Sequence, residues 1–171
     1  MARWHVATAW GVALLLACSG CGDGRPRGRH YEKAGKFSYD PPAGWEIVEL
    51  PGLKYRISRG APVKGFAPNI NGVDEASSVA LRDHVVANVK VIEAMWPSLG
   101  VLDRSDFRTT DGLLGHRMVT QRSEAKAKLR QTYYFFPSGG RKYVVTCTTL
   151  AEAGEALDAT FDTSMRTFRL R

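Results

Sequence analysis

The sequence is poor in cysteine and lacks the short motifs that mark several common classes of enzyme. Its three cysteines, Cys18, Cys21 and Cys147, include no repeated CxxC pair, which excludes the usual structural zinc arrangement. It contains no Gly-x-Ser-x-Gly elbow, no His-Glu-x-x-His helix and no P-loop. We therefore expect no catalytic constellation, no metal site and no cofactor, and we interpret the chain as a non-enzyme.

A hydrophobic run long enough to cross a membrane is also missing. The N-terminal apolar stretch from Val6 to Ala17 has about a dozen residues, whereas a transmembrane helix needs ~20. It follows Arg3 in a short basic segment and precedes small polar residues, which is typical of a secretory signal. We predict a signal peptide over residues 1–17.

The end of this segment resembles the bacterial lipobox, with Leu15, Leu16 and Ala17 directly before Cys18. The resemblance implies that Cys18 is the lipidation site, where the thiol receives a diacylglycerol and the cysteine becomes the new N-terminus. Cys21 is a second candidate, and secretion with a free cysteine near the cleavage site is the remaining alternative. A lipid anchor implies a bacterial cell envelope location, with the membrane as partner and the domain facing the periplasm or the exterior.

Residues 18–35 form a predicted flexible tether between the lipid and the folded domain. The segment is rich in glycine and shows no apolar periodicity. Its basic residues include Arg25, Arg27 and Arg29. These side chains could contact anionic headgroups, or the tether could simply be solvated.

Acidic residues are outnumbered in this chain, which has 24 Lys and Arg, 17 Asp and Glu, and a formal net charge of +7. Removing Arg3 with the signal peptide leaves +6. Lys126, Lys128 and Arg130 lie two residues apart, so a strand would present all three on one face. We predict a basic patch there for anionic lipid or an acidic protein, with a solvated hairpin tip as the alternative. Export argues against nucleic acid as a partner.

Two segments show the apolar spacing of helices. The first follows Ser78, the expected N-cap, and ends before Pro97. The second follows Thr149, which has capping-box spacing to Glu152. The apolar stripes are Leu81, Val85, Val89 and Ile92 in the first segment, and Ala153, Leu157, Phe161 and Met165 in the second.

Strand-like segments surround these helices. Short turns join the four that lie between the two helices, so we expect antiparallel hairpins. This order of elements predicts a single α+β domain over residues 36–171, with an antiparallel sheet flanked by helices. The expected strands cover residues 37–39, 45–49, 53–58, 68–73, 101–109, 115–121, 126–136, 141–149 and 168–170.

Five short stretches of this domain stand out by their order and spacing. They are Phe37-Ser-Tyr39, Pro42-Ala-Gly-Trp45, Asn69-Ile-Asn71 before the first helix, Lys142-Tyr-Val-Val-Thr146, and Thr167-Phe-Arg169. Together they resemble the PsbP-like family. The resemblance covers roughly residues 35–171 and departs from the family at Gly72-Val73, where a β-branched run usually continues. It implies an antiparallel sheet between helices, an α/β/α sandwich, and roles in binding and assembly rather than catalysis.

Few polar residues of the domain stand out as candidates for chemistry. We expect His84 to be exposed and His116 to be exposed or structural, and Cys147 to be a buried, inert thiol. The leading hypothesis is a membrane-anchored, non-enzymatic binding or assembly module. An envelope enzyme would instead need a polar pocket holding His84 or His116 with a carboxylate. A lipid-carrying protein would need an enclosed apolar cavity.

Overall fold

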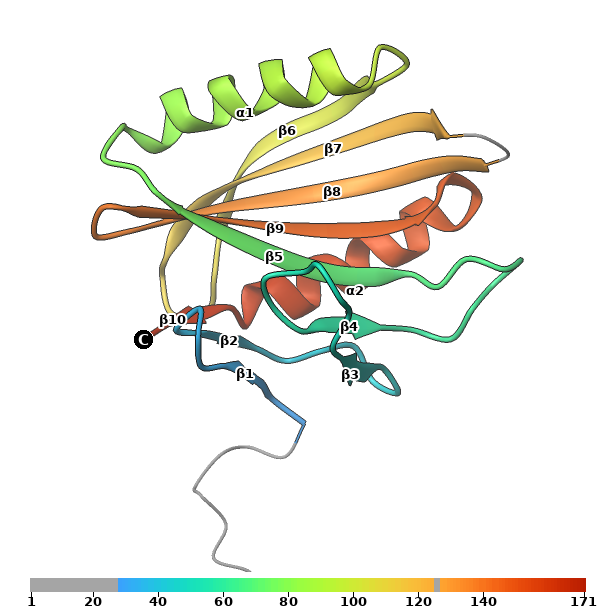
Figure 1. The fold of residues 1–171 in the computed structure, drawn as a ribbon, viewed down its shortest axis with the longest axis horizontal. Helices are drawn as coiled ribbons and strands as arrows, with labels where there is room; N and C mark the ends of the chain where they lie inside the picture. Colours follow the sequence, from blue (N-terminus) through green and yellow to red (C-terminus); the bar gives the residue numbers. More distant parts are fainter. Residues whose placement is uncertain (1–27, 125–126) are drawn as a thin grey trace, which may run out of the picture.

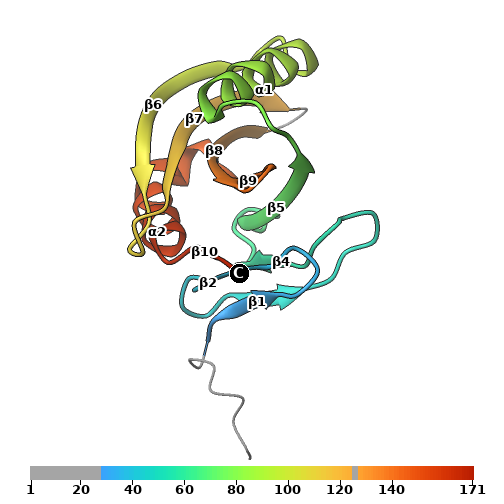
Figure 2. The same ribbon diagram turned by 90° about the vertical axis from the view of Figure 1, so that its left-hand side faces the viewer.

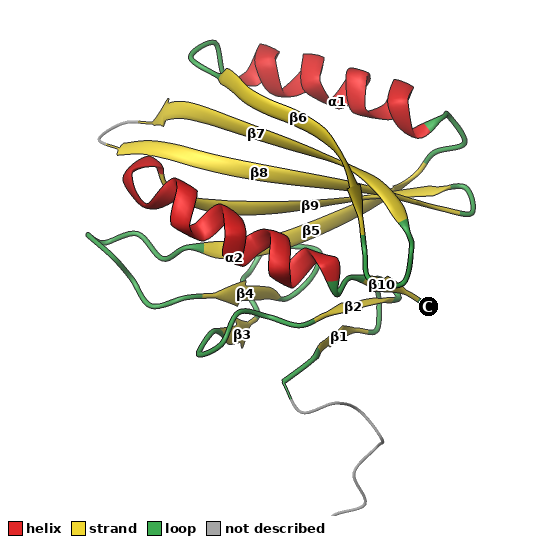
Figure 3. Cartoon of the chain, turned by 180° about the vertical axis from the view of Figure 1, so that it is seen from behind, coloured by secondary structure: helices red, strands yellow, loops and turns green. Residues whose placement is uncertain are grey.

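The computed structural model describes residues 28–124 and 127–171. The predicted signal peptide, Cys18, Cys21 and Lys126 lie outside the described residues. Within them, a large antiparallel sheet carries a helix on each face, as Figure 1 and Figure 3 show. The α+β architecture expected from the sequence, a sheet between helices, is confirmed.

The large sheet has seven strands in the order β3-β4-β5-β9-β8-β7-β6. Hairpins connect β6 through β9 in sequence, and β5 pairs with β9 along its whole length. The strands are β3 (Glu46–Val48), β4 (Ile57–Arg59), β5 (Asn69–Ala76), β6 (Gly100–Arg108), β7 (Leu114–Glu124), β8 (Ala127–Ser138) and β9 (Arg141–Leu150).

Alternate residues of β8 enter two hydrophobic cores on opposite faces of the sheet. Tyr133 and Phe135 pack under α1 (Leu81–Met95), whereas Tyr134 and Phe136 lie in the core under α2 (Gly154–Arg166). Successive side chains of a strand point to opposite faces, so an apolar run such as Tyr133–Phe136 needs cover on both sides. The two helices provide that cover, which confirms the expectation from the sequence. Figure 2 shows them on the two sides of the curved sheet.

Both helices form where predicted, but neither uses the predicted cap. Ser77 donates its backbone N–H to Gly140 and its carbonyl accepts from Lys142, so the chain stays extended past Ser78 and α1 begins at Leu81. Thr149 remains in the β8–β9 ladder opposite Arg130. A short 3₁₀ turn, η1 (Ala151–Ala153), therefore separates β9 from α2.

A second sheet of three strands closes one end of the domain, with β2 (Phe37–Tyr39) between β1 (His30–Glu32) and β10 (Arg169–Leu170). The sequence predicted a flexible tether over residues 18–35, but the structure has the strand β1 in the C-terminal part of that range. His30 and Glu32 are buried against β2, and the Arg29 guanidinium donates two hydrogen bonds to the Thr167 carbonyl at 3.0 and 2.8 Å. The folded domain thus includes Arg29 and β1, upstream of the predicted start at residue 36.

The strand expected at residues 53–58 is also shorter than predicted. Gly52, at a positive φ of 82°, and the Leu53 amide, which donates to Leu50, form a turn that leaves Leu53 exposed. Lys54 and Tyr55 both reach Asp74 on β5, which holds this segment outside the ladder until Ile57.

Candidate functional site

In the described part of the chain, an apolar groove lies between α1 and the edge of the large sheet. It has a volume of about 440 Å³. The helix supplies an apolar wall, and β6 and β7 supply the charged and polar rim. The groove is lined by Leu81, Arg82, Val85, Val86 and Val89 of α1, by Arg104 and Asp106 of β6, and by Gly115 and His116 of β7.

Gly115 is required where the groove meets the sheet. A Cβ at this position would lie 2.6 Å from the Phe135 carbonyl oxygen and 2.7 Å from the Phe136 ring. Real side chains do not tolerate such a distance, so only glycine lets β7 approach β8 this closely. Gly115 is therefore needed for the packing of the sheet, and it lines the groove only as a consequence of that packing.

The two arginines of the groove have weak partners. Arg82 lies 3.4 Å from Asp83, and Arg104 lies 4.0 Å from Glu93, with all four side chains substantially exposed. Exposed ion pairs of this kind contribute at most about 1 kcal/mol, because water screens them. Both guanidinium groups can therefore turn to an anionic group of a bound ligand.

His116 lies in this groove with a carboxylate nearby, which is the arrangement expected of an enzyme site. Its Nδ1 is 3.8 Å from Asp106, however, which is too far for a hydrogen bond, and the Asp106 side chain is fully exposed. A carboxylate hydrogen-bonded to the ring would orient it and fix its tautomer, and Asp106 makes no such bond. The lining is otherwise mainly apolar, so contact with an apolar ligand is the chemistry that the groove supports.

His84 is buried, and the prediction that it is exposed is wrong. The position flanks the apolar stripe of α1, so its ring packs edge-on against Phe135 and only 3% of the side chain is exposed. Nδ1 is 3.2 Å from the Glu75 carboxylate, and Nε2 is 3.2 Å from the Asn88 amide. Burial and the charge of Lys142 lower the pKa of His84, while Glu75 opposes them. Both ring nitrogens have partners, which marks the residue as structural.

The predicted basic patch is interrupted by an ion pair. The Arg130 guanidinium makes a bidentate contact with Asp158 on α2, in which Nε donates to Oδ1 at 3.1 Å and Nη2 donates to Oδ2 at 2.5 Å. It is thus held against the helix, while Lys128 is exposed near the strand start and Lys126 lies outside the described residues. The sequence spacing correctly put Lys128 and Arg130 on one face, but it could not show that α2 would place a carboxylate over that face.

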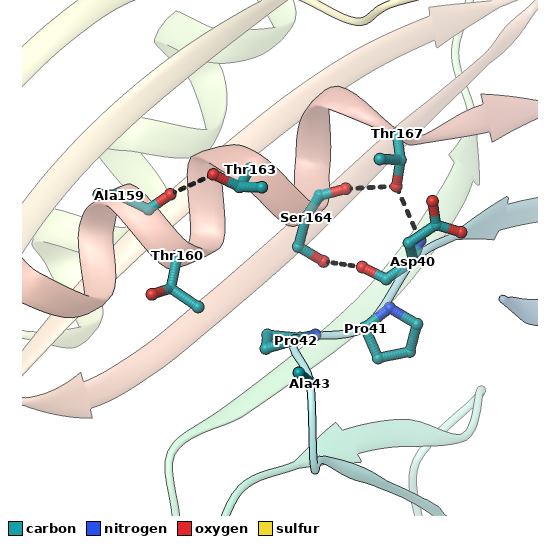
Figure 4. Close-up of a pocket in the computed structure, with 9 residues that line it drawn as sticks. All are labelled: Asp40, Pro41, Pro42, Ala43, Ala159, Thr160, Thr163, Ser164 and Thr167. Atoms are coloured by element: carbon teal, nitrogen blue, oxygen red, sulfur yellow. Dashed lines mark hydrogen bonds between the residues drawn. The ribbon is translucent and has the colours of Figure 1, made fainter. Parts of the chain in front are cut away.

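A second hollow, of about 480 Å³, lies between α2 and the segment Asp40–Ala43 (Figure 4). The hydroxyls that face it are bound to backbone atoms. Ser164 donates to the Asp40 carbonyl at 2.5 Å, Thr163 donates to the Ala159 carbonyl at 2.9 Å, and Thr167 accepts from the Asp40 amide at 2.7 Å. The Ser164 and Thr167 bonds hold Asp40 against α2 and its C-cap residue, so the hollow lies along the packing boundary between α2 and the Asp40–Ala43 segment.

Residues 28–124 and 127–171 lack both a metal-binding cluster and a membrane-spanning helix. They contain no cluster of three or more His, Cys, Asp or Glu side chains arranged for a metal ion. None of their helices has the length and apolar character needed to span a bilayer. Cys147 is a free thiol with no exposed surface, as predicted, and burial raises its pKa well above the usual value.

No protein-family model matches the sequence, and no curated protein is significantly similar to it. Solved structures nevertheless share its fold. The cyanobacterial PsbP protein CyanoP of Synechocystis aligns with a TM-score of 0.64 at 12% identity, over 90% of this chain and 99% of CyanoP. The fold is therefore PsbP-like, as the sequence resemblance implied.

Two bacterial proteins share the same architecture. LpqN of Mycobacterium tuberculosis, described as involved in cell envelope biogenesis, aligns with a TM-score of 0.58 at 13% identity, over 86% of this chain and 87% of LpqN. A protein of unknown function from Pseudomonas aeruginosa, PA94, aligns with a TM-score of 0.59 at 15% identity, over 74% of this chain and 97% of PA94. At these identities the likeness establishes the fold, and function has to be argued from the site.

Proposed function

We propose that this protein is a non-enzymatic binding module of a bacterial cell envelope, anchored to a membrane by a lipid on Cys18. The observation that carries the binding role is the groove between α1 and the β6 edge, where Val85, Val86 and Val89 form an apolar wall beside Arg82 and Arg104. Apolar contact combined with nearby cations fits an anionic amphiphile. The groove is open along one side, so it suits a bound ligand better than an enclosed lipid cargo.

The buried ionisable groups support a binding role over catalysis. Asp74, Asp158 and His84 are each engaged by structural partners within the fold. The envelope association of LpqN, a protein of the same fold, supports the proposed location.

Lipidation is tested by metabolic labelling with a fatty-acid probe. We expect Cys18→Ala to abolish labelling and to leave unprocessed precursor, because the thiol is the acylated atom. Cys21→Ala is the matched control and should label normally. Labelling that persists in Cys18→Ala and disappears in Cys21→Ala would assign the lipid anchor to Cys21. If neither the parent nor the variants are labelled, the proposal of a lipid anchor is wrong.

Groove binding is tested with an anionic apolar fluorophore such as anilinonaphthalene sulfonate. We expect Val86→Trp to fill the groove and to weaken dye binding about tenfold, equivalent to ~1.4 kcal/mol. Val91 is also on α1 and is similarly exposed, at 57% against 48% for Val86, but it does not line the groove. Val91→Trp should therefore bind the dye like the parent. Equal binding by all three proteins would contradict the assignment.

A further inference from the structure

A small hollow lies at the base of the tether, where β1 turns into β2. Its volume is about 160 Å³, which suits one small polar group rather than an acyl chain. Strand β1, the turn, the start of β2 and the last residue of the chain all contribute to it. The lining residues are Tyr31, Glu32, Lys33, Lys36, Phe37 and Arg171.

Positive charge dominates this hollow. Lys33, Lys36 and Arg171 are exposed, and none of the three forms an ion pair with a carboxylate of the described residues. The carboxylate in the lining, Glu32, is already engaged, since it accepts from the Ala34 amide at 3.1 Å and lies 3.6 Å from Arg56. Three side-chain cations thus line a hollow in which the Glu32 carboxylate is already engaged.

The backbone holds these cations in place. The Arg171 amide donates to the Lys36 carbonyl at 2.9 Å, and the Arg171 guanidinium lies over the Tyr31 ring at 4.4 Å. Lys36 adopts a positive φ of 54°, a conformation that non-glycine residues rarely take. A strained residue maintained by its surroundings is a reason to look for function at that position.

The hollow is on the side of the domain that faces the anchor. Nine residues lie between Cys18 and Gly28, the first described residue, so these ten chain steps span at most about 35 Å when fully extended. In Figure 1 and Figure 2 the small sheet and the chain end lie at the opposite end of the molecule from α1. A domain anchored through Cys18 can therefore bring Lys33, Lys36 and Arg171 to the headgroup layer.

We propose that this hollow is an anion site that receives the phosphate of a membrane phospholipid headgroup. The inference rests on the proposed membrane anchoring. Lys33, Lys36 and Arg171 donate hydrogen bonds to the phosphate oxygens and neutralise their charge. Docking here orients the domain with its small sheet on the membrane, which leaves the groove beside α1 facing away from the bilayer.

The test uses the chain after residue 17 with Cys18→Ser and Cys21→Ser, so that binding does not depend on acylation. Co-sedimentation with phosphatidylglycerol-containing vesicles and with pure phosphatidylcholine vesicles is measured at two salt concentrations. We expect the parent to bind the anionic vesicles preferentially and to lose affinity as salt rises, because charges near a surface are screened over ~8 Å at physiological ionic strength. The triple variant K33Q/K36Q/R171Q should bind about tenfold more weakly.

The matched control is K64Q/K90Q/R108Q, which removes the same charge from exposed basic residues outside the small sheet. We expect it to bind like the parent. Equal losses of vesicle affinity in the two triple variants would overturn the site, because they would show attraction by net charge alone. A parent protein that does not prefer anionic vesicles would also overturn it. If the triple variant fails to fold, K33Q alone should still show a partial loss, and an unchanged affinity would overturn the proposal.

A second arm separates the lipid from a free anion. Titration with inorganic phosphate, followed by NMR shifts of Lys33 and Lys36, should give weak binding, and phosphate should compete with vesicles. Phosphate binding without any vesicle binding would assign the site to a soluble phosphate and overturn the lipid assignment. Because this protein lacks the acylated cysteine, failure here is independent of the labelling result that tests the lipid anchor.

Discussion

At the scale of single residues, Asp74 links three separate segments of the chain. Its buried carboxylate accepts hydrogen bonds from Lys54, Tyr55 and Arg141, including one from the Arg141 Nε at 2.7 Å. Burial alone would raise the pKa of Asp74, but these donors outweigh it and lower the pKa from 3.8 to about 2. The sequence placed Asp74 directly after the strand expected at residues 68–73, yet its partners Lys54 and Arg141 lie 20 and 67 residues away, and local patterns carry no such information.

The lowered pKa predicts how stability depends on pH. The ionised carboxylate stabilises the folded state fully above about pH 4, and this contribution is lost as pH falls through about 2. We expect Asp74→Asn to cost about 2 kcal/mol of unfolding free energy at pH 7 and to flatten its decline between pH 4 and 2. Urea unfolding across this pH range measures both effects. Asp83→Asn, at an exposed carboxylate on α1, should change stability by less than ~0.5 kcal/mol.

At the scale of elements, periodicity located the helices and hairpins well and their ends poorly. The stripes through Val85 and Phe161 mark the buried faces of α1 and α2, because burial imposes the helical period on the sequence. Whether a residue caps a helix also depends on whether a neighbouring strand keeps its backbone extended. Thr149 pairs through its backbone with Arg130 in a ladder that continues to Leu150, so it does not cap a helix. Strand β1 is too short to show an alternating pattern.

The α2 stripe predicts one large mutational effect. Phe161 is 1% exposed and packs edge-on against Trp45, with ring centroids 6.0 Å apart. We expect Phe161→Ala to lower the unfolding free energy by about 3–5 kcal/mol, since it removes a buried ring and leaves a cavity. Phe161→Leu should cost less, because it keeps most of the buried volume. Denaturant titration compares the two, and a loss under ~1 kcal/mol for the alanine variant would show that this ring is not part of the core.

At the scale of the whole molecule, the two ends of the described chain are joined in one small sheet. Strand β2 pairs with β1 on one side and with β10 on the other. Phe37 of β2 stacks on Phe168 at 5.4 Å between ring centroids, which ties the small sheet to the core beneath α2. The sequence predicted a PsbP-like domain but started it at residue 36, because the glycine-rich composition before that point hides the short β1.

The pairing of β2 with both β1 and β10 predicts different stabilities for two truncated chains. A chain of residues 28–171 should unfold like the longer protein, whereas residues 36–171 should fold with a free energy of unfolding lower by at least about 2 kcal/mol. The shorter chain loses the β1–β2 ladder, the burial of His30 and the Arg29 bonds to Thr167. Thermal unfolding measures the difference, and amide exchange should show faster opening of β2. Indistinguishable melting curves would mean that β1 does not contribute to the stability of the domain.

The attachment of β1 also determines how the domain responds to mechanical force. Tension on the proposed membrane anchor would enter the fold at Gly28 and would meet the three-residue β1 and the Arg29 contacts before it reached the large sheet. Short ladders yield at low load, so β1 would peel away first and extend the linker by several residues. The seven-stranded sheet and both helices would then remain intact, and the detached strand could pair again with β2 once the tension is released.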